Sequence, residues 1–413
     1  MLTPRKDLTY YAGCFLIGMI FAVIVWLFMK LMNIGTAFLW NYLPGKFDLK
    51  AYPIIICLIG GLILGLIKTR YGESVYEMDV ILSDVKEGKK LQNENIILIF
   101  VSALIPIIFG GSIGPEAGLC CIIIVLCMWL SKFMTFFKKN IYDIYDVGIN
   151  SVFTLIFIAP LYGLVAPIED QEKSEKKTYS NIICILGAIL VFYILGQIFG
   201  GPVDFPYVGG YDISNFERLF GIPLAFIGSL FGIVYLIFDK YTGKIFEKMK
   251  FNDNILITCL IGGLILGIFG TISPMTLFSG EANMNIILET YAIYSPILLI
   301  VIGIAKLLLT NICIKSGWKG GHFFPVIFCG IIIGCGFSLL FNLDIGFSVA
   351  IVTASILGVL MKKPIGVALL LLLCFDPRIV PWLVVAAFIG SVIPTDWINL
   401  TKLEKEELKV EEY

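Results

Sequence analysis

Residues 57–65 have the sequence Cys-Leu-Ile-Gly-Gly-Leu-Ile-Leu-Gly, and residues 259–267 repeat the same nine letters 202 positions later. Segments rich in leucine, isoleucine and glycine match by chance often enough that this pair is weak evidence when taken alone. Further pairs of similar segments at nearly the same offset make the repeat informative.

Two other pairs of segments occur at about this offset. Gly110-Gly111 opens a glycine-rich turn before an apolar run, and Gly320-Gly321 does the same 210 positions later. Pro160 and Pro364, 204 positions apart, each precede an apolar run that ends in acidic residues. Three collinear pairs indicate a tandem duplication of about 200 residues. In a membrane protein, such a duplication points to a transporter or pore whose site lies between the halves.

The composition indicates a membrane protein. Hydrophobic residues make up 58% of the chain and charged residues 15%, against about 45–50% and about 25% in soluble domains. Several apolar runs are shorter than the roughly 20 residues that a bilayer-spanning helix needs, and they are interrupted by glycine and proline. We therefore predict an all-α polytopic membrane protein with broken and re-entrant helices, whose free backbone groups are buried in protein or line a wet cavity. The apolar runs fall near 11–33, 52–67, 95–109, 118–131, 147–168, 181–199, 219–238, 254–270, 293–314, 324–342, 346–361, 364–375 and 378–393.

The basic residues predict the orientation. Lysine and arginine cluster at 5–6, 68–70, 86–90, 132–139, 173–177 and 240–250, whereas the loops around 40–50, 201–217 and 341–347 contain fewer of them. The positive-inside rule then places both termini and the basic loops in the cytoplasm of a multi-pass cell-membrane protein. We expect the first apolar run to be retained, because it is too long for a signal peptide, and residues 401–413 to form a short cytoplasmic tail.

Several classes of function are disfavoured. The net charge of −1 and the absence of a basic patch give no reason to expect nucleic acid as a partner. Eleven cysteines lie mostly inside apolar runs without a CxxC pair, which is typical of small buried hydrophobes. A single histidine and no HExxH motif argue against an intramembrane enzyme, and we expect no metal and no cofactor.

The segment Gly110–Gly118 is the first candidate for a binding site. Its glycines allow a tight turn, and Pro115 suits the first turn of a helix. A helix that begins here directs free N–H groups and the positive end of its dipole at the preceding turn, which makes an anion site. Ser112, Ile113 and Gly114 are the candidate donors. A glycine-rich packing turn is the structural alternative, and the segment alone favours neither.

The segment Ser316–Pro325 has the same character in the second half. Gly321, His322 and Phe323 precede an apolar run, and their N–H groups are placed to face the same anion from the other side. Lys319 adds a positive charge near this point. The alternatives are an interfacial lysine and an ordinary polar residue at a helix start.

The segment Tyr71–Glu77 follows a basic cluster, and Ser74 supplies a hydroxyl that suits a dehydrated anion. Its counterpart in the second half is Phe278–Ala282. For Glu73, Glu77 and Glu281 we favour helix capping, because acidic residues are common in first helical turns.

These segments, in this order, resemble the signatures of the CLC family of chloride channels and proton-coupled chloride transporters. The family patterns are Gly-Ser-Gly-Ile-Pro, Gly-Lys/Arg-Glu-Gly-Pro and Gly-X-Phe-X-Pro. Residues 321–325 fit the third fully, residues 111–115 fit the second except in its middle, and residues 72–76 fit the first only at glycine. Supporting matches occur at 159–163, 304–308 and 364–366, so that the resemblance spans about residues 50 to 395.

The resemblance implies two inverted repeats, which we place at 1–200 and 201–400, and a homodimer with one pore per subunit. It further implies that chloride or another small anion is held by helix N-termini near the middle of the bilayer.

The departures from the family concern the expected mechanism. Ile113 stands where the family has a glutamate that gates the pore and carries protons, and Glu116 follows three residues later. The inner proton-relay acid falls at Asp170, where a solvated loop acid is an equal alternative. Glu73 stands in the register of the pore serine, and the pore tyrosine has no clear match, since Thr395-Asp396-Trp397 occupies its region.

Chloride transport is therefore the predicted function, and Ile113 favours passive, channel-like conduction. A proton-coupled chloride or fluoride antiporter that uses Glu116 or Glu73 is the alternative within the family. An inverted-repeat secondary transporter of an organic solute is the alternative outside it.

Overall fold

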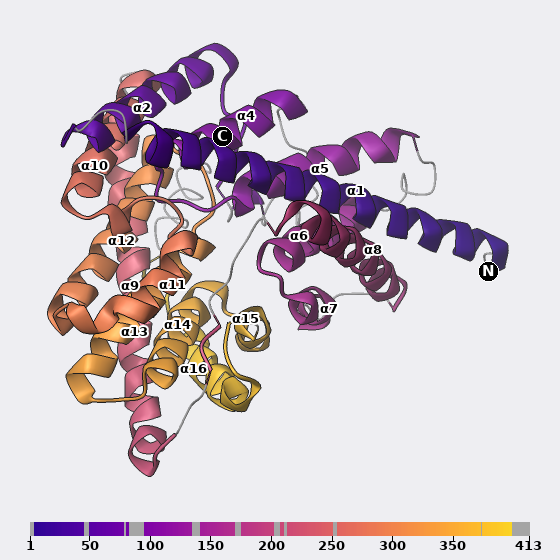
Figure 1. Ribbon diagram of the computed structural model, residues 1–413. Helices are drawn as coiled ribbons and strands as arrows, with labels where there is room; N and C mark the ends of the chain where they lie inside the picture. The colour runs from indigo at the N-terminus through magenta and orange to yellow at the C-terminus, as the bar shows by residue number, and fades with distance from the viewer. Residues whose placement is uncertain are drawn as a thin grey trace, which may run out of the picture.

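The computed structural model describes residues 4–44, 49–77, 80–81, 95–133, 141–169, 175–201, 207–209, 213–250, 254–372 and 374–398. These residues form helices joined by short turns (Figure 1). Asp170 and residues 401–413 lie outside them. The helices are α1 (Pro4–Ala37), continued by a π-helix (Phe38–Tyr42), α2 (Tyr52–Tyr71), α4 (Ile96–Ile108), α5 (Glu116–Phe133), α6 (Ile141–Ile156), α7 (Pro160–Glu169), α8 (Glu175–Phe199), α9 (Asn215–Lys250), α10 (Ile255–Ile272), α11 (Glu281–Thr290), α12 (Pro296–Ser316), α13 (Phe323–Phe341), α14 (Ile345–Met361), α15 (Pro364–Leu371) and α16 (Val380–Val392).

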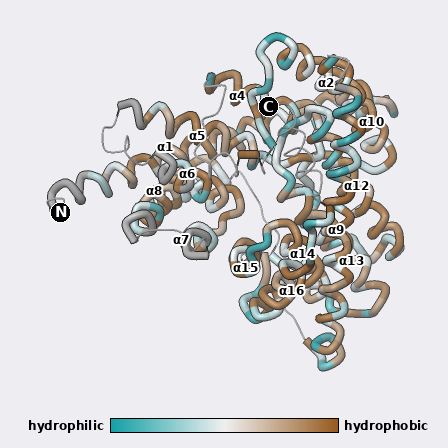
Figure 2. The backbone as a smooth tube through the Cα atoms, turned by 180° about the vertical axis from the view of Figure 1, so that it is seen from behind, coloured by the Kyte–Doolittle hydropathy of each residue, from teal (hydrophilic) through white to brown (hydrophobic). Residues whose placement is uncertain are grey.

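The all-α prediction is confirmed. Among the described residues, seven helices are long and apolar enough to cross a membrane. Others are apolar but shorter, such as Ile96–Ile108 and Val147–Ile156, as the interrupted runs predict. Hydrophobic residues dominate most of the helices (Figure 2).

The repeated nonapeptides pack against each other, and their contacts are reciprocal. A Cβ on Gly61 would lie 2.5 Å from the carbonyl oxygen of Cys259, and a Cβ on Gly263 would lie 2.5 Å from that of Cys57. Because Gly65 contacts Leu256 while Gly267 contacts Ile54, α2 and α10 run antiparallel (Figure 1). Glycine is needed here because any side chain would push the two backbones apart.

The other duplicated segments also meet their counterparts. Helix α7, which begins at Pro160, contacts α15, which begins at Pro364. The turn at Gly110-Gly111 and the turn at Gly320-Gly321 meet as well, as described below. A pseudo-two-fold relation between the halves therefore runs through all three pairs that the sequence singles out.

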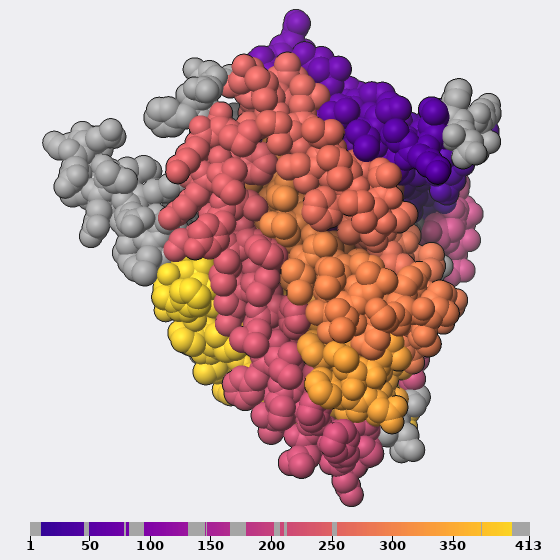
Figure 3. All heavy atoms as spheres, turned by 90° about the vertical axis from the view of Figure 1, so that its left-hand side faces the viewer, coloured from indigo at the N-terminus to yellow at the C-terminus, as the bar shows by residue number. Residues whose placement is uncertain are grey.

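The helices that follow the two glycine-rich turns lie inside the molecule. Almost every residue of α13 and α14 is buried, and so is most of α5. On the outside, α9 runs between the yellow α16 and the orange α12 and α13 in Figure 3. Its exposed residues form an apolar stripe at helical spacing, which suits contact with lipid. The stripe consists of Phe216, Leu219, Ile222, Phe226 and Leu230.

Candidate functional site

The two glycine-rich turns are joined by a pair of backbone hydrogen bonds. The N–H of Gly114 donates to the carbonyl of Gly321, and the N–H of Gly321 donates to the carbonyl of Gly114, both at 2.8 Å. The starts of α5 and α13 therefore lie side by side at the contact between the halves, which we call the junction. Since both N–H groups are engaged in this pair, these glycines shape the junction by permitting close approach.

Glu116, the first residue of α5, places its carboxyl group at the junction. Its side chain is fully buried, and Oε1 accepts a hydrogen bond of 2.8 Å from the N–H of Phe324 in the first turn of α13. A Cβ added to Gly321 would lie 1.7 Å from Oε2, and one added to Gly114 would lie 2.1 Å from it. The carboxyl group thus fills the space over both glycines, where the sequence predicts an anion.

The second oxygen of this carboxyl is buried without a hydrogen-bond partner among the described residues. A buried polar oxygen without a partner is costly, and the few found in native structures tend to mark a catalytic or binding role. Glu116 therefore sits at a helix N-terminus, the place that favours negative charge, with one oxygen uncommitted.

Ile113 is fully buried and packs against the opposite turn. Its side-chain carbons lie 2.5–2.9 Å from the position that a Cβ on Gly320 would take. Its N–H donates to the carbonyl of Gly111 at 2.8 Å. Ile113 therefore contributes an aliphatic wall to the junction.

The hydroxyls of the two candidate serines differ in their surroundings. Ser112 is buried, and its Oγ lies 3.2 Å from Oγ1 of Thr310 in α12, so it already has a partner in the other half. Ser74 is buried, and its Oγ has no hydrogen-bond partner among the described residues. A free buried hydroxyl suits an anion ligand, because an anion satisfies a donor that the protein leaves unpaired.

Residues 110–114 also fit the letters G-x-S-x-G of the hydrolase nucleophile elbow. That motif follows a strand, whereas helix α4 precedes this turn, and the partner of Ser112 is a threonine. The segment therefore lacks the structural context of a nucleophile.

His322 and Phe323 begin α13, and both side chains are buried in an aromatic group. The ring of His322 lies 4.5 Å from that of Phe323 and 5.6 Å from that of Tyr235, and Phe323 packs edge-on against Phe153. The N-cap residue His322 makes no side-chain cap, so its own side chain does not occupy the first-turn N–H groups of α13. Any contribution of these two residues to anion binding comes from the backbone.

Glu73, a predicted proton-relay candidate, lies in an ion pair. Its Oε2 is 2.9 Å from Nζ of Lys68, whose side chain is almost entirely buried. The sequence favours a cap for Glu73, and the structure shows that a lysine in α2 is its partner instead.

Glu77 likewise forms ion pairs where the sequence favours a cap. Its carboxylate bridges Lys315, at 2.7 Å, and Lys319, and Lys315 also contacts Asp239 at 2.9 Å. Burial by itself would raise the pKa of Glu77, but the two lysines outweigh it and lower the pKa to about 2. These pairs hold the segment with Ser74 against the end of α12.

Lys306 is a positioning residue to which the sequence assigns no role, although it lies in the matching segment 304–308. It is fully buried in α12, and its Nζ donates to the carbonyls of Thr276, Leu277 and Phe278 at 3.2, 3.0 and 2.9 Å. Phe278 in turn donates its N–H to the carbonyl of Gly110 at 3.1 Å. The charge inside an apolar run was the available signal, because such a charge must find partners.

Comparison with known proteins gives one family and several related structures. A family model described as voltage gated chloride channel matches residues 72–395. Two curated relatives, H(+)/Cl(-) exchange transporters ClcA from two strains of Klebsiella pneumoniae, are each 26% identical over 234 residues, which cover 54% of this chain and 49% of the relative. The chain thus spans about half the length of the curated relatives it matches.

Three similar solved structures cover nearly the whole chain. A CLC-type fluoride/proton antiporter gives a TM-score of 0.79 at 19% identity, covering 95% of this chain and 97% of its own. A slow cyanobacterial Cl−/H+ antiporter gives 0.79 at 18% identity, covering 98% and 99%. A eukaryotic CLC transporter gives 0.70 at 16% identity, covering 98% and 75%. At these identities the likeness shows the fold, and it confirms the predicted two-repeat architecture.

Proposed function

The chain belongs to the voltage-gated chloride channel (CLC) family, and from this membership we propose that it transports small anions across a membrane with Glu116 as its gating carboxyl group. The path runs through the junction, between the starts of α5 and α13. Ser74, with its unpaired hydroxyl, is the further ligand on the side of α2.

One observation supports this proposal above the others: the carboxyl of Glu116 lies at the start of α13, where a helix N-terminus favours negative charge. This carboxyl accepts a hydrogen bond from the N–H of Phe324 and lies over Gly114 and Gly321. A carboxylate and a transported anion compete for the same donors. Protonation removes the charge of Glu116 and weakens its hold on the donor, so that binding of a proton and release of the site are linked.

This geometry favours proton-coupled exchange over passive conduction. The argument for passive conduction is that Ile113, which lines the junction, cannot change its charge. Glu116, three residues later, returns a titratable group to the same space. The coupled mode also agrees with the names of the relatives, which are exchangers of protons with chloride or fluoride.

Chloride is the proposed substrate, with fluoride as the second candidate. The N–H groups of Ile113, Gly114 and Gly321 are bonded to carbonyls. The proposed ligands are therefore the N–H groups at the start of α13 and the hydroxyl of Ser74, which suit any small anion and give no site for an organic group. Membership of the family removes the basis for an organic solute.

The test is simultaneous recording of chloride and proton movement with the full-length protein in liposomes. We expect a proton gradient to drive chloride uphill, and Glu116→Gln to abolish this coupling while downhill chloride flux persists. Glu289→Gln, which alters an exposed carboxylate of α11, is the control. Chloride flux without proton movement in the unmodified protein would establish the passive mode instead.

We also propose the orientation that the basic residues predict. Lys68, at the end of α2, and Lys315, at the end of α12, lie together at the cluster around Glu77. The positive-inside rule makes this end of the molecule cytoplasmic. A reporter fused to the N-terminus should then be protected from protease in intact cells.

A further inference from the structure

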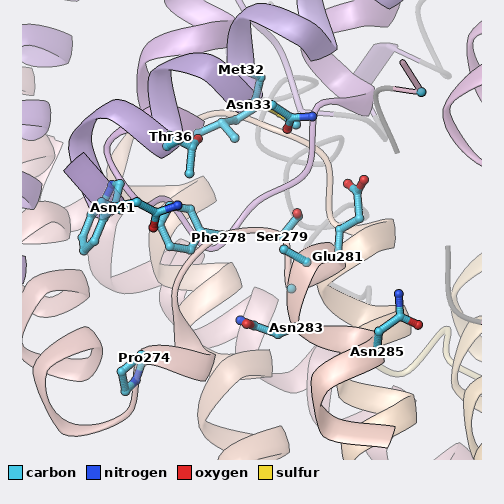
Figure 4. Close-up of a pocket in the computed structure, with 16 residues that line it drawn as sticks. Met32, Asn33, Thr36, Asn41, Pro274, Phe278, Ser279, Glu281, Asn283 and Asn285 are labelled. Carbon is cyan, nitrogen blue, oxygen red and sulfur yellow. The ribbon is translucent and has the colours of Figure 1, made fainter. Parts of the chain in front are cut away.

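A cavity of about 770 Å³ with a mixed polar and apolar lining lies between the end of α1 and the start of α11. Figure 4 shows its side chains coming from two sides, with α1 above and the segment 274–285 below. Four amides and two acidic or hydroxyl groups give it a wettable lining. These are Asn33, Asn41, Asn283, Asn285, Ser279 and Glu281.

The cavity lies at the end of the molecule opposite the basic cluster. Its lining residue Trp40 packs edge-on against Tyr52, the first residue of α2. Lys68 and its partner Glu73 are at the other end of this 20-residue helix. Twenty helical residues span about 30 Å, the thickness of a bilayer core. With the basic end inside the cell, the cavity opens to the outside.

Glu281, the first residue of α11, forms part of this cavity. Its Oε2 is buried and has no hydrogen-bond partner among the described residues. Glu281 lies in the first turn of α11, where the sequence favours a cap, and the N-cap residue Gly280 makes no side-chain cap. Glu281 thus combines a place in the cavity lining with a buried carboxyl oxygen that lacks a partner among the described residues, which suits a group that takes up a proton from water and passes it inward.

The floor of the cavity lies close to the junction. A Cβ on Gly280 would be 2.5 Å from the ring of Phe328, which is four residues after Phe324, whose N–H binds Glu116. Four helical residues rise about 6 Å. Glu281 and Glu116 are close enough for their charges to interact. Two carboxyls whose charges interact in a low-dielectric site disfavour joint ionisation, which suits transfer of a proton from one to the other.

Buried Lys306 fixes Glu281 relative to the junction. It binds the three carbonyls of 276–278, just before α11, and Phe278 donates to the carbonyl of Gly110, just before the turn that carries Glu116. Glu116 from α5 is thus a charged group that acts on Glu281, and Lys306 from α12 holds the backbone just before it. The second half of the chain thus fixes the position of Glu281 near Glu116, the proposed gate, which belongs to the first half.

We propose that this cavity is the outer entry for protons and that Glu281 relays them to Glu116; the inference rests on the proposed function, in which Glu116 binds and releases a proton. A hydrated proton in the cavity protonates the carboxylate of Glu281. The proton then passes to the carboxylate of Glu116, directly or through one water, and Glu281 returns to its ionised form. This route replaces the outer titratable group that Ile113 does not supply.

The first test measures the ratio of proton to chloride flux in liposomes for the unmodified protein, Glu281→Gln and Glu289→Gln. Glu289 lies on the exposed side of the same helix, so its variant controls for the loss of a negative charge from α11. We expect Glu281→Gln to lower the ratio at least about tenfold while chloride flux persists, as for loss of a proton-transfer group, and Glu289→Gln to leave the ratio unchanged. A normal ratio in Glu281→Gln would overturn the relay.

The second test asks from which side the cavity is reached. Glu281→Cys is exposed to a small, charged, membrane-impermeant thiol reagent in vesicles of known protein orientation. The eleven native cysteines are buried, so their background reaction should be low. We expect reaction from the outside alone, and reaction from the inside alone would overturn the inference.

The two tests separate this inference from the proposed function. If the unmodified protein moves no protons, the proton-coupled function and the relay both fail. If it moves protons and Glu281→Gln does so with the same ratio, the relay alone fails and Glu116 keeps its role.

Discussion

At the scale of single residues, the site depends on where helix α5 begins. Helical spacing would place residues 113 and 116 on one face, but α5 starts only at Glu116, and Ile113 belongs to the turn before it. The N–H of Ile113 closes that turn on the carbonyl of Gly111. Ile113 therefore extends to the junction from a turn and contributes an aliphatic surface, whereas Glu116 extends to it from the first residue of a helix and contributes a carboxyl group.

Gly321→Val should reduce the flux of every anion. Its new Cβ would lie 1.7 Å from Oε2 of Glu116, so the junction must open or the carboxyl must move. Chloride, nitrate and fluoride fluxes in liposomes measure the effect, after gel filtration has shown that the variant is folded. Gly243→Val is the control, because the nearest atom to its Cβ lies 3.8 Å away. Normal flux in a folded Gly321→Val protein would remove the junction from the anion path.

Ile113→Glu should slow chloride transport and make its rate increase as pH falls. The new carboxylate competes with the anion for backbone donors when it is charged, and protonation ends the competition. The initial rate of chloride efflux between pH 4 and 8 checks this, with Ile113→Leu as the control for packing. A rate with the same pH dependence as that of the unmodified protein would show that residue 113 does not face the anion.

At the scale of elements, the antiparallel packing of α2 on α10 joins the halves. Gly61→Val and Gly263→Val should each destabilise the protein by about 1–3 kcal/mol, because each forces a Cβ onto a carbonyl 2.5 Å away. Since the contacts are reciprocal, the two losses should be similar. Thermal unfolding in detergent compares them with Gly196→Val, where the nearest atom lies 4.0 Å away. A loss at one position without the other would contradict the pseudo-symmetry.

The attachment of segment 72–77 to α12 should weaken in acid. The pKa of Glu77 is lowered from 4.5 to about 2, so its ion pairs contribute fully above pH 4.5 and are lost as pH falls through 2. By linkage this amounts to at most about 3 kcal/mol. Glu77→Gln should be less stable at pH 7, and its melting temperature should fall less than that of the unmodified protein between pH 5 and 3. If the melting temperatures of Glu77→Gln and of the unmodified protein fell equally over this pH range, the ion pairs of Glu77 would not contribute to stability.

The elements and their pairing were predictable from sequence to a large extent, and the charged partners were not. The nonapeptide and the paired glycine turns are local patterns, and the duplication implies that copies face each other. Ion pairs join residues far apart in the chain: Glu77 and Lys315 are 238 positions apart. Spacing also does not show that Glu116 reaches over Gly321, because this depends on the turn before the helix. The sequence favours a cap for Glu281. It does not show the cavity around this residue, because the cavity forms only when α1 and α11 pack together.

At the scale of the whole molecule, the resemblance to the family predicts a homodimer whose subunits conduct independently. Mass measurement or cross-linking in detergent should give twice the 45.9 kDa of one chain. A dimer with Gly321→Val in one subunit should keep about half of its flux, because each pore is built within one chain. A stable monomer with full activity would refute the prediction.

The reciprocal glycine contacts also bear on the ancestry of the chain. A surface on which Cys57 and Gly61 meet the equivalent Cys259 and Gly263 is complementary to itself. Two separate half-length copies, inserted into the membrane in opposite orientations, would present the same pairing to each other. Fusion into one polypeptide makes the two copies equal in number and fixes their opposed orientation. It also leaves each copy free to diverge, so that one now supplies Glu116 and the other the N–H of Phe324 that binds it.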